Sequence, residues 1–333
     1  MKWFFITLLA AAPLSAAEDY TMSFLDIGVG ARALGMGSAF TGVANDGTAG
    51  YWNPAGISFV PGRQLSGMYG PQFGSIGDPL AHFHFIGFTQ PLAGGAAVSV
   101  SWIRLAIDDI PVYSELQGDS YWERYHDPSL RPTGIPEASL QDTEDALFFT
   151  FAKKHSARLD PGWHYDKIRA DFSAGLNLKL IRQTLGDYSA AGIGVDAGLL
   201  CRFHIGDLLG NDKAGVFGAG LMITDITSSR MTWNTNHQDE RSASVRWGVT
   251  YSHPVQALAG DLRFAYDRDA RYNGTSHFGL EYQGLGLLSM RTGISGGHVT
   301  AGAGISFWQI SVDYCFLSHE LDSLHRLSCS LVF

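Results

Sequence analysis

Apolar and polar residues alternate along most of the chain from about residue 62 to the C-terminus. In the segment 169–180, Phe172, Leu176 and Leu178 share one face of an extended chain, and Asp171 and Lys179 share the other. Because successive side chains of a β-strand point to opposite sides, this period of two predicts strands with one apolar and one polar face. About 14 such strands are predicted, at 62–70, 81–91, 94–106, 143–155, 167–182, 190–205, 213–225, 242–253, 258–268, 274–283, 286–294, 298–306, 307–316 and 325–333.

Two architectures are built from strands of this kind. A soluble β-sandwich packs two apolar faces together, whereas a transmembrane barrel turns its apolar face to lipid and its polar face to a lumen. Several predicted strands are about ten residues long or longer, enough to cross a bilayer when tilted, and charged residues such as Arg169 recur in mid-strand. Aromatic residues near strand ends resemble interfacial girdles, at Trp102, Trp247, Tyr251, Tyr282 and Trp308. The sequence therefore predicts an all-β fold, a transmembrane antiparallel β-barrel.

The connections between the predicted strands indicate an orientation. Barrels of the bacterial outer membrane have long extracellular loops and short periplasmic turns. The two longest connections, 107–142 and 226–241, follow the third and seventh predicted strands, and most connections after even-numbered strands are short, with 154–166 as an exception. An even number of strands then places both termini in the periplasm.

The N-terminus has the pattern of an export signal. Lys2 supplies a positive charge, 3–9 an apolar core, and Ser15, Ala16 and Ala17 a cleavage site of small residues. No later run reaches the roughly 18 apolar residues of a spanning helix. We therefore divide the chain into a signal peptide at 1–17, an N-terminal segment at 18–61 and a barrel at 62–333, located in the outer membrane.

The segment 18–61 lacks sustained alternation and is rich in glycine. A barrel of about 14 strands leaves a lumen that something must fill, and irregular backbone is tolerated there because it does not face lipid. We expect this segment to be a hatch, or plug, with short helices. Ser38 is placed to cap a helix at 39–44, and Asn53 to cap one that begins with Pro54.

Charge and metal-binding residue types narrow the partners. The formal net charge is −9, and the segment 107–145 alone contributes −8, from ten acidic residues and two arginines. Such a segment repels phosphate backbones, so nucleic acid is excluded as a partner.

The metal-binding residue types form no complete site. Three cysteines without metal-binding spacing favour neither disulfides nor zinc. His82 and His84 give two candidate ligands without a third, so we interpret these histidines as polar residues of the lumen. Gly28, Gly30 and Ala33 match a dinucleotide fingerprint, but Gly35 and Gly37 interrupt the helix it requires. We expect no cofactor and no metal.

Two motifs carry a family resemblance. The sequence GARALGMGSAF at 30–40 with YWNPAG at 51–56 resembles the N-terminal signature of PorV/PorQ proteins, a branch of the FadL-type outer-membrane barrels, and the tail from Asp313 to Phe333 is similar to their closing hairpin. The resemblance implies a fourteen-stranded barrel with a hatch. It also implies that Phe333 is read by the barrel-assembly machinery. The hatch motif it assigns consists of Gly30, Arg32, Gly35, Gly37, Asn53, Pro54, Ala55 and Gly56.

The resemblance implies two activities, and the sequence leaves both open. One is passive transport of small hydrophobic molecules, for which Leu34, Met36, Phe40 and Trp52 are candidate ligand contacts. The other is an accessory role in type IX secretion, in which secreted cargo proteins dock on the barrel, for which the loop aromatics Tyr113, Tyr121, Trp122 and Tyr125 suit an interface. An acyl-hydrolase at the rim is a weaker alternative, because no catalytic residues can be assigned from spacing. We therefore expect a protein that is not an enzyme, whose partners include outer-membrane lipid.

Overall fold

The computed structural model describes residues 21–75, 77–131, 134–160, 162, 167–211, 214–271, 274–318 and 323–333. The predicted signal peptide at 1–17 lies outside the described residues, as do residues 18–20 and part of the C-terminal motif. Among the described residues, no helix has the length and apolar character needed to span a bilayer.

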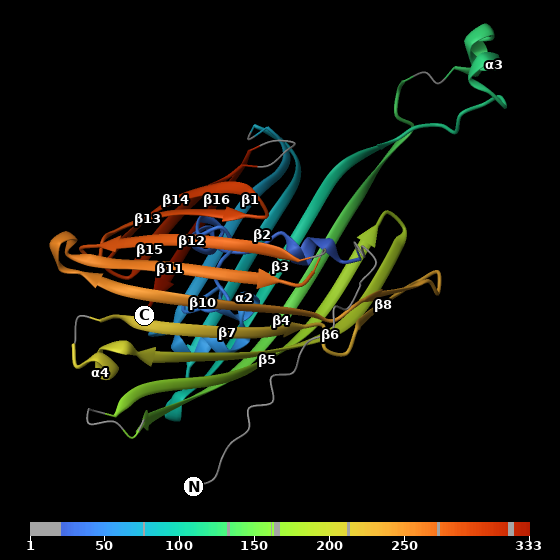
Figure 1. Ribbon diagram of the computed structural model, residues 1–333. Coiled ribbons are helices and arrows are strands. Elements are labelled where there is room, and N and C mark those ends of the chain that lie inside the picture. The colour runs from blue at the N-terminus through green and yellow to red at the C-terminus, as the bar shows by residue number, and fades with distance from the viewer. Residues whose placement is uncertain are drawn as a thin grey trace.

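The strands form one antiparallel sheet that closes into a barrel (Figure 1). It closes where β1 pairs with β16, from Gln64 opposite Val332 to Tyr69 opposite Leu327. The wall has 14 strands, which confirms the predicted fold class. The sheet comprises β1 (Gln64–Ser75), β2 (Asp78–Pro91), β3 (Ala96–Val112), β4 (Ala138–Leu159), β5 (Ile168–Leu185), β6 (Tyr188–His204), β7 (Val216–Thr224), β8 (Ser229–Trp233), β9 (Gln238–Arg241), β10 (Ser244–Val255), β11 (Gly260–Asp269), β12 (Thr275–Gly284), β13 (Leu288–Ser295), β14 (His298–Phe307), β15 (Ile310–Leu317) and β16 (Leu324–Val332).

Two of the wall strands are interrupted. Strand β6 pairs with β7 and, further along, with β8, while β7 pairs with β10 and β8 with β9. β7 and β8 are therefore one wall strand broken at 225–228, and β9 and β10 are another broken at 242–243. The prediction of a loop at 226–241 is wrong, because backbone pairing with β6 continues the ladder where the sequence alternation is too short to signal it.

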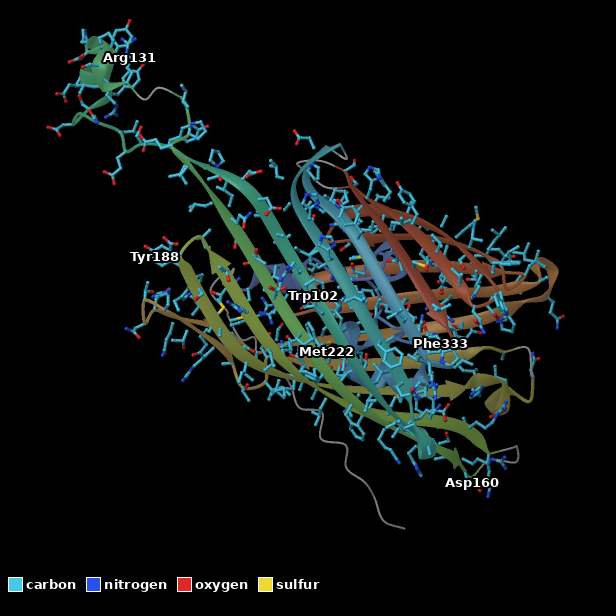
Figure 2. The ribbon with its side chains drawn as sticks, turned by 180° about the vertical axis from the view of Figure 1, so that it is seen from behind. Trp102, Arg131, Asp160, Tyr188, Met222 and Phe333 are labelled. Atoms are coloured by element: carbon cyan, nitrogen blue, oxygen red, sulfur yellow. The ribbon has the colours of Figure 1, made fainter. Side chains whose placement is uncertain are left out.

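The two ends of the barrel differ. We call one the arm end, because the connection between β3 and β4 there carries α3 (Tyr121–His126) and η4 (Pro128–Leu130) away from the wall (Figure 1). The other is the terminal end, where Phe333 lies, together with η3 (Ala93–Gly95), α4 (Ile205–Leu209) and η5 (Gln256–Leu258) (Figure 2). Strands β3 and β4 extend to residues 112 and 138, so the arm is shorter than the predicted connection at 107–142. Strand β4 also runs to residue 159, which shortens the exceptional connection at 154–166.

The outer face of the wall is apolar and the inner face is largely polar. On β5, Leu176 and Leu178 are exposed on the outside, whereas Asn177 and Lys179 point inward and are at most 3% exposed. A soluble sandwich would bury the leucines and expose the lysine. The inverse arrangement is that of a transmembrane barrel, as the alternation predicts.

Residues 21–61, which we call the lumenal segment, lie inside the ring of strands (Figure 1). Its elements are η1 (Ser23–Asp26), α1 (Ala31–Gly35), α2 (Ala49–Trp52) and η2 (Pro54–Phe59). Helix α1 contacts β13–β16 and η2 contacts β2–β6, so the segment touches opposite sides of the wall. Asn53 caps η2 as expected, since its side chain accepts a hydrogen bond from the backbone N–H of Ala55. The predicted helix at 39–44 is wrong: those residues form turns, and Ser38 has a positive φ of 63°.

Candidate functional site

The inner wall changes character along the barrel. In the arm-side half of β2, β3 and β4, five inward side chains are apolar and at most 8% exposed, namely Phe83, Phe85, Ile103, Leu105 and Phe148, and nearer the arm the inward position of β4 is Glu144, which bonds Gln183. Toward the terminal end, the same strands present small polar side chains, namely Thr89, Ser99, Ser101 and Thr150. The lumens of porins are polar and filled with water. The arm-side wall could not be left bare to water without a cost of roughly 25 cal/mol per Å² of apolar surface.

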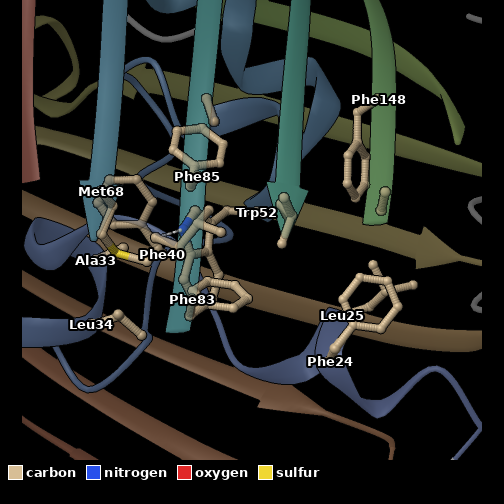
Figure 3. Close-up of a cluster of buried hydrophobic side chains, with 14 of the residues drawn as sticks. Phe24, Leu25, Ala33, Leu34, Phe40, Trp52, Met68, Phe83, Phe85 and Phe148 are labelled. Atoms are coloured by element: carbon tan, nitrogen blue, oxygen red, sulfur yellow. Dashed lines mark hydrogen bonds between the residues drawn. The ribbon is translucent and has the colours of Figure 1, made fainter. Parts of the chain in front are cut away.

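The lumenal segment covers this apolar wall (Figure 3). Phe24 and Leu25 of η1 are buried with Phe148 in one apolar cluster, and Tyr51 lies edge-on to Phe148 with ring centroids 6.4 Å apart. The Tyr51 hydroxyl donates a 2.6 Å hydrogen bond to the carbonyl of Leu25, which holds η1 against α2. The apolar wall and its apolar cover together form the core of the protein.

The four predicted ligand contacts all lie in this core. Leu34, Met36, Phe40 and Trp52 are at most 2% exposed. Trp52 borders a narrow cavity of about 60 Å³, with Leu25, Tyr51 and Phe148 on one side and mostly charged residues, among them Asp225 and Arg241, on the other. The other three border none of the cavities described here, so in this conformation they are packing residues.

Arg32 of α1 ties the lumenal segment to the wall. Its guanidinium makes two hydrogen bonds to the carboxylate of Glu281 on β12, at 2.8 and 2.9 Å, and an ion pair with Asp46 at 3.1 Å. The wall residues Arg263 and Arg291 also pair with Glu281. Because of these two arginines, Glu281 remains neutralised when Arg32 moves away.

Glycines set how closely the segment approaches the wall. Gly37 has a φ of 62°, and a Cβ there would lie 2.4 Å from the carbonyl oxygen of Phe278. Gly35 lies against Gly302 of β14, where a Cβ would be 3.3 Å from the glycine Cα. Gly30 also has a positive φ, of 85°, while Gly56 packs on Ala44 within the segment. The predicted motif glycines thus lie where side chains would separate the segment from the wall or from itself.

Asn53 joins three parts of the site. It is fully buried, and its amide nitrogen donates to the carbonyl of Thr41 at 3.1 Å and to the carbonyl of Leu199 on β6 at 3.0 Å. Its amide oxygen accepts from Ala55 at 3.1 Å. Pro54 lies against Gly175 of β5, where a Cβ would be 2.4 Å from the proline carbonyl carbon. These contacts fix η2 to the wall.

A second wall carboxylate holds the turn that the sequence analysis expected to be helical. The N–H groups of Phe40 and Thr41 both donate to Asp267 of β11, at 2.9 and 2.8 Å, and Arg246 of β10 pairs with the same carboxylate at 3.2 Å. Arg246 also donates to the carbonyl of Ser38. Sequence reasoning missed both residues, because their partners in the lumenal segment lie more than 200 residues away along the chain.

A buried cluster of charges lies where the wall strands are interrupted. Asp225, which follows β7, is fully buried and pairs with Lys179 at 2.5 Å, Arg241 at 3.0 Å and Arg271 at 3.2 Å. Arg241 also pairs with Asp26 of η1 at 2.6 Å. The cluster therefore joins the break in the wall to the first element of the lumenal segment. No sequence motif signals it.

Two polar cavities open at the terminal end, on the far side of the lumenal segment. One, of about 400 Å³, is bordered by Arg32 and Asp313 and by six serines, at positions 66, 289, 306, 311, 328 and 330. The other, of about 360 Å³, includes Arg202, whose guanidinium lies 4.0 Å from the ring of Phe59. At its rim, hydrogen bonds from Arg169 lower the pKa of Asp207 to about 2.

The histidines of β2 are not in the lumen, which corrects our interpretation of them. Phe83 and Phe85 occupy the inward positions, so His82 and His84 point outward, where the His82 ring hydrogen-bonds the hydroxyl of Tyr69 at 2.9 Å. The described residues contain no group of three or more potential metal ligands.

One His–Ser pair bears on the hydrolase alternative. His277 of β12 lies 3.0 Å from Ser295 and equally close to the carbonyl of Gly37, and it is 7% exposed. The lumenal segment covers the pair, so a substrate has no access to the serine in this conformation.

The arm displays the predicted aromatic residues. Tyr121, Trp122 and Tyr125 of α3 are 56–68% exposed and stack on one another rather than on the barrel. Tyr113 is exposed at the base of the arm. Acidic residues alternate with these rings, at positions 115, 119, 123 and 127.

Phe333 lies beside the closing seam of the barrel at the terminal end (Figure 2). Its N–H donates to the carbonyl of Arg63 at 2.9 Å, and its ring stacks on Phe88 with centroids 6.2 Å apart. The side chain is 53% exposed, on the outer, apolar face.

No protein-family model matches the chain, and no curated protein matches it. Its structure is similar to the crystal structure of the Pseudomonas putida toluene transporter TodX, with 13% identity over 91% of this chain and 97% of that chain and a TM-score of 0.47. A Pseudomonas aeruginosa FadL homologue has 10% identity over 89% and 96% of the two chains, with a TM-score of 0.44. The Acinetobacter baumannii outer membrane protein Omp33 has 9% identity over 82% and 98%, with a TM-score of 0.40. These likenesses concern the fold alone, and the PorV/PorQ resemblance stays a prediction.

Proposed function

We propose that the protein is an outer-membrane channel for small hydrophobic molecules and that the lumenal segment is its movable hatch. The observation that carries the proposal is the apolar arm-side wall, with Phe83, Phe85 and Phe148 facing inward beneath the lumenal segment. An apolar wall offers no favourable contacts to ions or sugars, whereas contact with it stabilises a hydrophobic solute relative to water.

The path we propose starts at the arm end. The cavity that Leu25, Trp52 and Phe148 border on one side, and charged residues such as Asp225 on the other, is narrow, and an entering solute would displace η1 first. Movement of η1 then uncovers the core in which Leu34, Met36 and Phe40 are packed, and these become ligand contacts in the displaced state. The polar cavities at the terminal end supply the exit.

We place the protein in the bacterial outer membrane, with the arm outside and both termini in the periplasm. An epitope inserted after Gly134, in the arm, should bind antibody on intact cells. The same epitope inserted after Gly286, in the turn between β12 and β13 at the terminal end, should bind only after permeabilisation. Antibody binding at Gly286 on intact cells would reverse the orientation.

Dye uptake tests the channel. N-phenylnaphthylamine fluoresces when it leaves water for an apolar environment, and it enters intact Gram-negative cells slowly. We expect Arg32→Ala to accelerate its uptake several-fold over the unaltered barrel, because the hatch loses its tie to Glu281 while two wall arginines still neutralise that carboxylate. Removal of residues 18–61 should also open the lumen to ions.

Arg230→Ala is the matched control. Arg230 is also an arginine paired with a carboxylate, Glu240, but 69% of its side chain is exposed and it borders neither polar cavity. It should leave uptake unchanged. Equal uptake by cells with the unaltered barrel, with Arg32→Ala and without any barrel would refute a channel for hydrophobic molecules.

We propose protein docking at the arm as a second candidate function, supported by the exposed aromatic and acidic residues of α3. Such a patch is typical of interfaces rather than of a bare loop, and the resemblance to PorV/PorQ points to cargo of type IX secretion. Replacing 114–136 by a short glycine-serine linker should abolish cargo retention and leave dye uptake intact. Loss of dye uptake with retention of cargo would refute the assignment of cargo docking to the arm and of dye uptake to the barrel.

A further inference from the structure

A shallow trough runs across the outer wall of the barrel at right angles to the strands. It has a volume of about 610 Å³ and is lined by β7 and β10–β14. Its two sides are two rows of cross-strand neighbours. One row is Phe217, Tyr251, Phe264, Leu280 and Thr292, and the other is Val249, Tyr266, Phe278, Ile294 and Val299.

The floor of the trough is the row between these two, whose residues point inward. It consists of Thr250, Ala265, Gly279 and Gly293, again paired strand to strand. A Cβ on Gly279 would lie 2.5 Å from the carbonyl oxygen of Met36, and one on Gly293 would lie 2.3 Å from the N–H nitrogen of Gly37. Only the strand backbone therefore separates the lumenal segment from the trough at these glycines.

The dimensions of the trough determine what can occupy it. Residues two apart on one strand face are about 6.6–6.8 Å apart, so the two rows leave the width of one hydrocarbon chain. A helix with its side chains is about 10 Å across, and a second sheet packs about 10 Å away. Both are too wide to enter the space between the two rows. Five strand spacings of about 4.8 Å give a length of about 24 Å, longer than one leaflet of a hydrocarbon core about 30 Å thick.

The surface that lines the trough consists almost entirely of carbon atoms of apolar side chains. The four hydroxyl groups along the trough have partners within the wall. Thr292 donates to the carbonyl of Thr300 and Thr250 to that of Phe264, Tyr251 bonds His253, and the Tyr266 hydroxyl lies 3.4 Å from that of Ser276. Half-exposed aromatic side chains such as Phe264 and Phe278 provide the sides.

A second trough of about 480 Å³ repeats the construction on β4–β7. Its rows include the paired residues Phe151, Leu176, Ala197 and Ile223, and its floor is the pair Gly175 and Gly198. These glycines lie against Pro54 and Asn53 of the lumenal segment. A trough therefore arises twice where paired wall glycines abut the lumenal segment, but the second is smaller and carries Lys153 on one side.

We propose that the trough on β10–β14 binds a single acyl chain of a membrane phospholipid. The inference rests on the proposed placement of the barrel in a membrane. The bound chain lies over Gly279 and Gly293, the two residues against which Met36 and Gly37 are seated.

Photolabelling tests the proposal. The purified barrel is inserted into phosphatidylcholine liposomes in which a fraction of the lipid carries a diazirine in its acyl chain, and cross-linked peptides are mapped after irradiation. We expect several-fold more labelling of β12 and β13 than of outward residues with similar exposure on β3, such as Val100. Thr292→Trp should fill the trough and reduce that labelling to the level of β3.

Met290→Trp is the matched control, because Met290 lies two residues away on the same outward face of β13 and does not line the trough. It should leave the excess labelling unchanged. Val299→Trp fills the trough from its other side and replaces Thr292→Trp if that variant does not fold, as judged by the heat-dependent gel shift of the barrel. Uniform labelling of all outward faces, or unchanged labelling of β12 and β13 in Thr292→Trp, overturns the trough proposal alone. No labelling of any strand overturns the membrane placement together with it.

Discussion

Replacing Asn53 by alanine removes the side chain that joins the lumenal segment to itself and to the wall. The variant loses a cap on η2 and two donated hydrogen bonds, one to Thr41 within the segment and one to Leu199 on β6. Asn53 is fully buried, so no water replaces these bonds while the segment stays seated. The perturbation therefore acts on the seated state and leaves the strand ladder intact.

The size of the effect follows from the three lost bonds. An N-cap contributes about 1 kcal/mol, and each of the other two bonds contributes about 1 kcal/mol net. Only the bond to Leu199 joins the segment to the wall, so the direct effect on the ratio of displaced to seated hatch is about 1 kcal/mol, or roughly fivefold, since each 1.4 kcal/mol is tenfold.

Two further variants separate the cap from the tie to the wall. Asn53→Asp keeps the oxygen that caps Ala55 but loses both donors and sets a carboxylate against two carbonyl oxygens, so it should open the hatch at least as much. Ser58→Ala removes a half-buried hydroxyl that donates to the Ala55 carbonyl and bonds the Ser173 hydroxyl at 2.8 Å, while Ser173 still donates to that carbonyl at 2.9 Å and Asn53 keeps its bonds. It should behave almost as the unaltered protein does.

Single-channel recording in planar bilayers measures the open fraction directly. We expect rare openings in the unaltered barrel and in Ser58→Ala, and more frequent openings in Asn53→Ala and Asn53→Asp. The reasoning fails if Asn53→Ala has the same open fraction as Ser58→Ala while its gel shift shows a folded barrel. An unaltered barrel that conducts continuously would refute the hatch itself.

Three other changes give distinct readouts. Gly37→Ala places a Cβ 2.4 Å from a wall carbonyl oxygen and should raise the open fraction in bilayers, whereas Gly286→Ala, at a φ of 64° with no atom within 4 Å, should not. Asp225→Ala removes the carboxylate that Lys179, Arg241 and Arg271 share, while Lys179 keeps Asp196 and Arg241 keeps Asp26. It should destabilise the barrel by up to about 3–5 kcal/mol in urea unfolding followed by gel shift; an unchanged midpoint would contradict it. Phe333→Asp puts a charge on the outer face near the lipid boundary, at a cost of up to a few kcal/mol, and should reduce the folded barrel recovered from membranes; equal recovery would count against an assembly role.

The strands were predictable because their signal is local. A period of two places Leu176 outside and Lys179 inside without reference to any other part of the chain, and each of the 14 predicted strands coincides with a wall strand. Strand ends were less predictable. The extension of β3 carries Asp108 and Asp109 and a register shift between Ile107 and Ile110, so apolar alternation does not reveal it. Strands β8 and β9 were also missed, because they are short and too polar to show apolar alternation.

The lumenal segment was less predictable because distant residues decide its conformation. Ser38 suits a helix cap by local chemistry, but the N–H groups of Phe40 and Thr41 are taken by Asp267, 226 or more residues away along the chain. The partner of Arg32 is Glu281, 249 residues further on. The motif glycines could be recognised as positions of close approach, whereas the wall residues that they approach could not.

The way the lumenal segment is held also gives a reason why a hydrophobic solute would open it. Its polar ties, at Arg32, Asn53 and Asp26, exchange for hydrogen bonds to water at a net cost of about 1 kcal/mol for each neutral bond and about 1.5–3 kcal/mol for each charged one. Its apolar cover has no such substitute in water, because exposing side chains such as Phe24 and Leu25 costs about 1.5–3 kcal/mol each, in addition to the bared wall. A solute that replaces this apolar contact removes that cost, whereas an ion does not. On the proposed function, opening is therefore selective for hydrophobic molecules before any specific ligand contact is made.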